Sequence, residues 1–193
     1  MTAEAGIVIS DLHIASTAGL CPPWGIRIDG GGTYMPNKYQ LATWACWQNF
    51  WEVHVPRACE GQRPKFVVLN GDIFEGLHHN QTGVVTTTWE EMKRAAVAIL
   101  GPVRELCDRL YIVRGTEAHA GRMGEAEEGL GQLIGAEEND IGERSNWQLW
   151  GKLDNVLCHF AHHISTTSSA AYETSAPMRE LTAALVEAAQ WDQ

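Results

Sequence analysis

Acidic and imidazole side chains follow two short apolar runs in this chain. Asp11-Leu12-His13 comes directly after the run 6–10, and Asn70-Gly71-Asp72 follows a second run, 66–69. Aspartate oxygen and histidine nitrogen are ligands for borderline divalent metals such as zinc, manganese or iron. A carboxylate from each segment could let one of them bridge two ions. The pattern therefore predicts a metal site.

Further groups of the same chemistry occur later in the chain, again after predicted strands. Any one cluster arises often by chance, whereas four clusters in the same strand-to-loop position favour a shared site, because ligands bind at the carboxyl ends of strands in open α/β sheets. The candidates are Asp11 and His13; Asn70, Asp72 and Glu75; Glu117 and His119; and His159, His162 and His163.

The hydrophobic pattern predicts the elements that position these groups. Alternation of strands and helices through the first two-thirds of the chain indicates an α/β fold. A capping box at Thr88–Glu91 predicts the start of a helix, and Pro177 predicts another. The remaining expectations are strands at 6–10, 65–70 and 110–113, a loop at 14–37, helices at 38–55 and 125–136, and a hairpin of 147–150 with 156–160.

The predicted helix at 38–55 is rich in tryptophan. Its apolar stripe contains Leu41, Trp44, Gln48, Trp51 and Val55. Such rings can stack on nucleic-acid bases, but packing against a sheet is the commoner role and is the one we expect.

Composition narrows the class of protein. The chain has 193 residues, 45% hydrophobic and 20% charged, which suits one globular domain. Its formal net charge of -10 disfavours broad binding to nucleic acid, although a substrate held through metal ions remains compatible. Five widely spaced cysteines suit a reducing cytoplasm, and no segment predicts a membrane span.

The order of the motifs resembles that of the calcineurin-like metallophosphoesterases, most closely phage and prophage members. The family pattern is D-x-H, G-D-x-x-D, G-N-H-[DE], a lone His and G-H-x-H. Asp11–His13 matches the first motif and Gly71–Glu75 resembles the second, while 114–119 and 160–163 stand where the third and fourth belong. The resemblance covers nearly the whole chain. It implies a layered α-β-β-α sandwich over 1–193, with 14–64 inserted between the first two motifs.

The resemblance also implies roles. Asp11 and His13 would hold one metal, and Asp72 would bridge to a second metal bound by His162, with His163 as the neighbouring alternative. His119 would act as the catalytic histidine near the leaving group. The remaining candidates, as substrate or supporting groups, are Asn70, Glu75, His78, His159 and His163; a core role for His159 and an exposed loop position for His78 are the simpler alternatives.

Two departures from the family pattern matter. The asparagine ligand is missing from the third motif; Thr116 replaces it by count, but Glu117 is the better oxygen ligand and the one we prefer, which favours manganese. No G-H-x-H follows His163 before Gln193, so we expect a chain truncated at its C-terminus.

The function predicted is hydrolysis of a phosphomono- or phosphodiester by two divalent ions, Mn²⁺ with Fe or Zn as alternatives, in the cytoplasm (of the host, if phage-encoded). The alternatives are a non-catalytic metal-binding or scaffold protein of the same fold, and a phage nuclease. The expected partner is a phosphoester, which includes nucleic acid; we expect no membrane partner.

Overall fold

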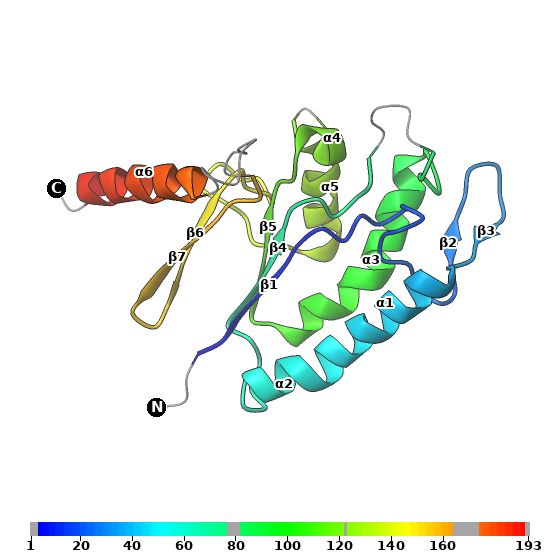
Figure 1. Cartoon of the computed structure of the whole chain (residues 1–193), viewed down its shortest axis with the longest axis horizontal. Helices are drawn as coiled ribbons and strands as arrows, with labels where there is room; N and C mark the ends of the chain where they lie inside the picture. Colours follow the sequence, from blue (N-terminus) through cyan, green and yellow to red (C-terminus); the bar gives the residue numbers. More distant parts are fainter. Residues whose placement is uncertain (1–3, 77–81, 122, 164–173, 192–193) are drawn as a thin grey trace. The chain divides into compact units, whose positions relative to one another are not determined.

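The computed structural model describes residues 4–76, 82–121, 123–163 and 174–191. Within them the chain is mixed α/β, with a parallel three-stranded sheet and helices (Figure 1). Its internal contacts divide it into two compact units, Met1–His162 and His163–Gln193. The single-domain prediction stays a prediction. None of the described helices is long and apolar enough to cross a membrane.

The parallel sheet is built from the three apolar runs that the sequence predicted as strands. β1 (Gly6–Ile9) pairs with β4 (Phe66–Asn70), and β4 pairs with β5 (Arg109–Val113), in the order β1-β4-β5. The parallel registers bring the carboxyl ends of all three strands to one edge of the sheet. Side chains that follow these ends therefore meet there.

Successive side chains of β4 alternate between two apolar clusters. Val67 and Leu69 lie in the main core with the helices, whereas Phe66 and Val68 lie in a second cluster. The second cluster is completed by the hairpin of β6 (Leu149–Leu153) and β7 (Val156–Phe160). Both faces of β4 are thus buried, which explains its continuous apolar sequence. The predicted hairpin is confirmed, although its first strand spans Leu149–Leu153 and not 147–150.

The tryptophan-rich segment is helical but not one regular α-helix. α1 (Lys38–Asn49) continues into a π-helical turn, η1 (Phe50–His54), and then into α2 (Val55–Ala58). A π turn adds a residue to the helical repeat and shifts the side chains that follow it around the axis. The boundaries of the predicted helix at 38–55 are therefore nearly right, and its uniform period is not.

The inward face of α1 differs from the predicted stripe at its first turn. Trp44 is buried as expected, but Leu41 is 45% exposed and Gln40 is fully buried in its place. The Gln40 amide donates to the carbonyl oxygens of Ser16 and Gly19, at 2.9 and 3.0 Å. These long-range hydrogen bonds compensate the burial of a polar side chain, which the hydrophobic pattern could not indicate.

The long helix α3 (Trp89–Leu106) begins after Thr88, as predicted, but its cap is different. The Thr88 hydroxyl donates to Asp29 Oδ1 at 2.6 Å, and its side chain makes no capping hydrogen bond. The expected capping box is therefore wrong, because Asp29 offers the Thr88 hydroxyl a charged acceptor from a distant part of the chain.

The other elements are short, apart from the last helix. The segment 14–37, expected as a loop, contains a small antiparallel pair of strands. In the second unit the final helix begins two residues before Pro177, which stands in its first turn. These elements are β2 (Ile26–Arg27), β3 (Thr33–Tyr34), α4 (Glu117–Ala120), α5 (Glu125–Ile134) and α6 (Ser175–Trp191).

Candidate metal centre

The residues that follow β1 and β4 have unusual backbone conformations. φ is 59° at Asp11, 44° at His13 and 49° at Asp72, a left-handed region that non-glycine residues rarely adopt. The Asp11 N–H donates to the Gly71 carbonyl at 3.1 Å, and the His13 N–H donates to the Asp72 carbonyl at 3.0 Å. Three residues with strained backbones thus lie close together, and such strain is common at binding sites.

Asp72 lies at the centre of this edge. The residue is buried, at 5% exposure. Oδ1 accepts hydrogen bonds from the Thr116 N–H at 2.8 Å and from the Thr116 hydroxyl at 3.2 Å. Oδ2 lies 3.1 Å from His162 Nε2 and 3.7 Å from His119 Nε2. One carboxylate oxygen is therefore held by the loop that follows β5 (the β5 loop), and the other faces two imidazoles.

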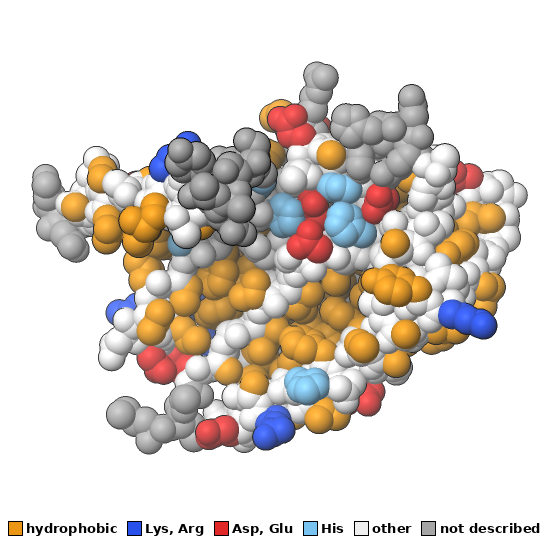
Figure 2. Space-filling view, viewed as in Figure 1, with side chains coloured by type: hydrophobic (Ala, Val, Ile, Leu, Met, Phe, Trp, Pro, Cys, Tyr) orange, Lys and Arg blue, Asp and Glu red, His pale blue; other side chains and the backbone are white. Residues whose placement is uncertain are grey.

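Asp72 belongs to two groups of side chains that could each hold a metal ion. One group is His13, Asp72 and His119; the other is Asp11, Asp72 and His162. In each group the candidate ligand atoms lie within 4.8 Å of one another. Mixed imidazole and carboxylate donors suit Zn²⁺, Fe²⁺ or Mn²⁺. Acidic and histidine side chains gather on one face of the molecule (Figure 2).

Backbone carbonyls orient two of the histidines. His119 Nδ1 lies 2.5 Å from the Glu75 carbonyl oxygen, and His162 Nδ1 lies 2.6 Å from the Asn70 carbonyl oxygen. A carbonyl only accepts, so in both rings Nδ1 carries the proton and donates it. In the neutral imidazole this leaves Nε2 unprotonated on the side that faces Asp72, the usual preparation of a metal-binding histidine.

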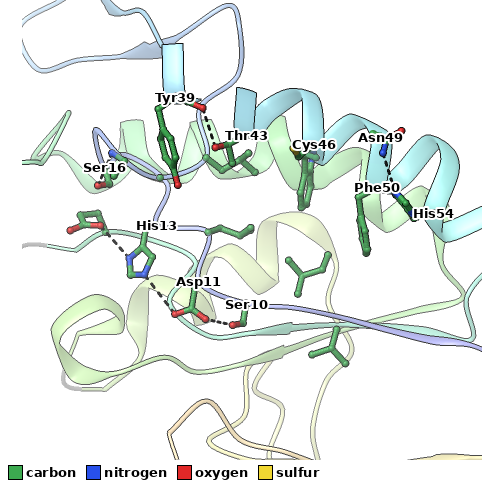
Figure 3. A pocket seen from close by; sticks show the side chains of 18 residues that line it. Ser10, Asp11, His13, Ser16, Tyr39, Thr43, Cys46, Asn49, Phe50 and His54 are labelled. Atoms are coloured by element: carbon green, nitrogen blue, oxygen red, sulfur yellow. Dashed lines mark hydrogen bonds and ion pairs between the residues drawn. The ribbon is translucent and has the colours of Figure 1, made fainter. Parts of the chain in front are cut away.

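His13 is held between two carboxylates. Its Nε2 lies 3.7 Å from Asp11 Oδ1 and its Nδ1 lies 3.2 Å from Glu75 Oε2 (Figure 3). Its ring also packs edge-on against the ring of His119, with centroids 4.7 Å apart. Glu75 therefore contacts one histidine through its carboxylate and the other through its carbonyl.

The third motif contributes through its backbone and its threonine. Glu117 is exposed in the first turn of α4 and belongs to neither group, whereas Thr116 contacts Asp72 directly. The backbone here approaches very closely: a Cβ atom on Gly115 would lie 2.3 Å from Asp72 Oδ1. Only a glycine at this position lets the β5 loop reach Asp72.

Asn70 ends β4 beside the centre. Its Nδ2 donates to the Ala161 carbonyl at 3.4 Å, while Oδ1 is buried without a hydrogen-bond partner among the described residues. A buried acceptor without a partner is costly, and a bound cation or water would satisfy it. The residues present thus fit a metal centre.

The remaining predicted residues lie apart from these two groups. His159, in β7, has its Nε2 2.9 Å from Gln148 Oε1 and stacks on Trp150, so it serves the hairpin. His163 is exposed and begins the second unit. His78 lies outside the described residues.

Sequence reasoning missed one buried acid beside the centre, Glu127 in α5. Its side chain has no solvent exposure. Burial raises the pKa of Glu127 from its ordinary value of 4.5 to about 7, although hydrogen bonds from the N–H groups of Gly115 and Ile73 act to lower it. A glutamate three residues before the buried Leu130, on the apolar face of α5, was the signal that could have revealed it.

The metal-free protein is expected to lose stability between pH 4.5 and about 7 because of Glu127. The folded state binds this proton more tightly than the unfolded chain, so the contribution is full below pH 4.5 and declines as the pH rises. The shift corresponds to about 3 kcal/mol. Urea unfolding of the wild type and of Glu127→Gln across this pH range measures the difference in the free energy of unfolding. If that free energy changed with pH in the same way in both proteins, the prediction for Glu127 would be contradicted.

A groove of about 910 Å³ opens beside the centre, between β1 and the helical segment α1–η1. Asp11 and His13 line it, and Tyr39 and Phe50 project toward it from the helical side (Figure 3). Trp47 adds a third ring, and no Lys or Arg is among the described residues that line the groove. The candidate metal ligands thus adjoin an aromatic surface, whose described residues include neither Lys nor Arg.

Comparisons with family models, curated proteins and solved structures found no match to this chain.

Proposed function

We propose that the protein is a metal-dependent phosphoesterase that hydrolyses a phosphomono- or phosphodiester at a dinuclear centre. The observation that carries the proposal is Asp72, a buried carboxylate that belongs to both groups of side chains that could bind a metal ion. Each group supplies three side chains among the described residues. With His119 kept for proton transfer, one site has three protein ligands and the other has two, which leaves room for water and substrate.

Each side chain then has a role. Asp72 would bridge the two ions, Asp11 and His162 would complete one site, and His13 would complete the other. Two bound divalent ions would clamp a phosphate and lower the pKa of the attacking water. His119, whose Nε2 lies 3.7 Å from Asp72 Oδ2, would give the leaving oxygen a proton from Nε2 when both of its ring nitrogens are protonated. Mn²⁺ is the ion we propose first, with Fe and Zn as alternatives.

The groove supplies a place for the organic part of the ester. Its aromatic rings, and the absence of Lys and Arg from the described residues that line it, favour an uncharged group there, while the phosphate would lie at the centre. This arrangement gives no support to a nuclease that binds through phosphate contacts along a strand.

The proposal extends to the family. The order of motifs resembles the calcineurin-like metallophosphoesterases of phage type, and the burial of the sheet between the helices and the β6–β7 hairpin supports the layered α-β-β-α architecture. A cytoplasmic location is part of the same proposal.

A metal-binding protein without catalysis is the second candidate. The observation in its favour is the third motif, where Glu117 faces solvent and the Thr116 hydroxyl is bonded to Asp72.

The test is hydrolysis of bis(p-nitrophenyl) phosphate and p-nitrophenyl phosphate by metal-free protein, before and after addition of Mn²⁺. We expect turnover only with the metal, and equal turnover in Asp140→Asn, an exposed acid outside both groups. Calorimetry on the same samples measures Mn²⁺ binding. Tight binding without turnover of either ester would favour the second candidate, and absence of binding would contradict both.

A further inference from the structure

The buried carboxylate of Glu127 accepts hydrogen bonds from two different loops. Oε2 accepts from the Gly115 N–H at 2.7 Å, and Oε1 accepts a long hydrogen bond from the Ile73 N–H at 3.5 Å. Gly115 follows β5 and Ile73 follows β4, so one side chain from α5 joins the loops at the ends of two neighbouring strands.

Both loops bear directly on Asp72. Ile73 is the next residue in the chain, and Gly115 precedes Thr116, whose N–H and hydroxyl bind Asp72 Oδ1. Asp72 is therefore held in two ways. Thr116 donates to its side chain, while Glu127 accepts from the N–H of the residue before Thr116 and from the N–H of the residue after Asp72. Displacement of either N–H would move the shared carboxylate relative to the histidines.

The fold alone does not require a carboxylate at this position. Among the described residues Glu127 makes no ion pair with Lys or Arg, and a charge buried without a cationic partner is costly. A glutamine has nearly the same shape and lower cost, but only one acceptor oxygen, so it cannot accept from both N–H groups. What the carboxylate adds is the second acceptor.

We propose that Glu127 is a positioning residue that fixes Asp72 between the two metal groups by joining the loops after β4 and β5. The proposal rests on the proposed function for its effect on metal binding, but its structural part concerns the protein without metal. Glu127 touches neither substrate nor ion in this scheme and acts through Asp72 alone.

The experiment compares wild type, Glu127→Gln and Glu125→Gln, the last being an exposed acid on the same helix. In metal-free protein, amide hydrogen exchange followed by NMR reads the two N–H groups directly. We expect faster exchange at Ile73, Gly115 or both in Glu127→Gln, with exchange in α3 unchanged. Mn²⁺ titration should show binding about 10- to 100-fold weaker, and Glu125→Gln should behave as the wild type in both measurements.

The outcomes separate this proposal from the proposed function. Unchanged exchange at both amides together with unchanged Mn²⁺ affinity would overturn the role of Glu127. Faster exchange in α3 as well as at the two amides would also overturn it, since it would show general destabilisation. Wild type that binds no Mn²⁺ would refute the proposed function, and the exchange data would still decide whether Glu127 holds the two loops.

Discussion

Asp72→Asn is expected to lower kcat/KM for phosphoester hydrolysis on the order of 10³-fold, equivalent to about 4 kcal/mol of transition-state stabilisation. The asparagine oxygen can still accept from the Thr116 N–H, as Asp72 Oδ1 does now. Its amide nitrogen, however, replaces the acceptor that faces His162 and His119 with a donor. The variant thus removes the proposed shared ligand and leaves the packing nearly unchanged.

Steady-state kinetics and calorimetric titration with Mn²⁺ measure the two parts of this prediction. Binding in Asp72→Asn should be weakened at both sites, because both groups contain this residue. The thermal unfolding midpoint of the metal-free variant should stay close to that of the wild type, which shows that the fold is intact. Full activity in a folded Asp72→Asn protein would refute the dinuclear assignment.

Gly115→Ala is expected to destabilise the protein by about 1–3 kcal/mol and to abolish Mn²⁺ binding. The added Cβ would lie 2.3 Å from Asp72 Oδ1 and 2.4 Å from the Asp72 backbone nitrogen. Neither atom can move aside easily, since one belongs to the main chain and the other is bonded to Thr116. The β5 loop must then retreat, and with it the contacts that hold Asp72.

Gly101→Ala is the matched control for this substitution. Gly101 lies within α3, and a Cβ atom there would meet no atom of the described residues within 4 Å. The alanine should stabilise the helix by about 0.5–1 kcal/mol and leave Mn²⁺ binding unchanged. Urea unfolding and metal titration of both variants give the comparison; wild-type stability and binding in Gly115→Ala would show that the loop can shift without loss.

The elements that position the site were predictable because their signals are local. β1, β4 and β5 are continuous apolar runs, and parallel pairing brings their carboxyl ends together, so Asp11 and Asp72 could be placed at one edge from the sequence. The sequence could not indicate which side chains of the loops at that edge point toward Asp72 and which point into solvent. Thr116 rather than Glu117 meets Asp72 because α4 begins at Glu117 and leaves its side chain in solvent.

Long-range polar contacts account for the other differences. Gln40 replaces Leu41 in the core because two distant carbonyls accept its amide hydrogens, and Thr88 turns from its helix to Asp29. The burial of Glu127 has the same cause, since the two N–H groups that bond to it lie in the loops that follow β4 and β5. Periodicity records which side chains are apolar, and it carries no information on which polar group will find a partner elsewhere.

The long sequence separation between His162 and the rest of the centre affects the order in which the protein folds. Its ring bonds to the carbonyl of Asn70, a residue 92 positions earlier in the chain. Closing so long a loop is entropically costly, so contacts of this kind form after local ones. We therefore expect the centre to be completed after the sheet and helices have formed. A divalent ion would then stabilise the finished fold by mass action and slow its unfolding, while the folding rate would hardly change.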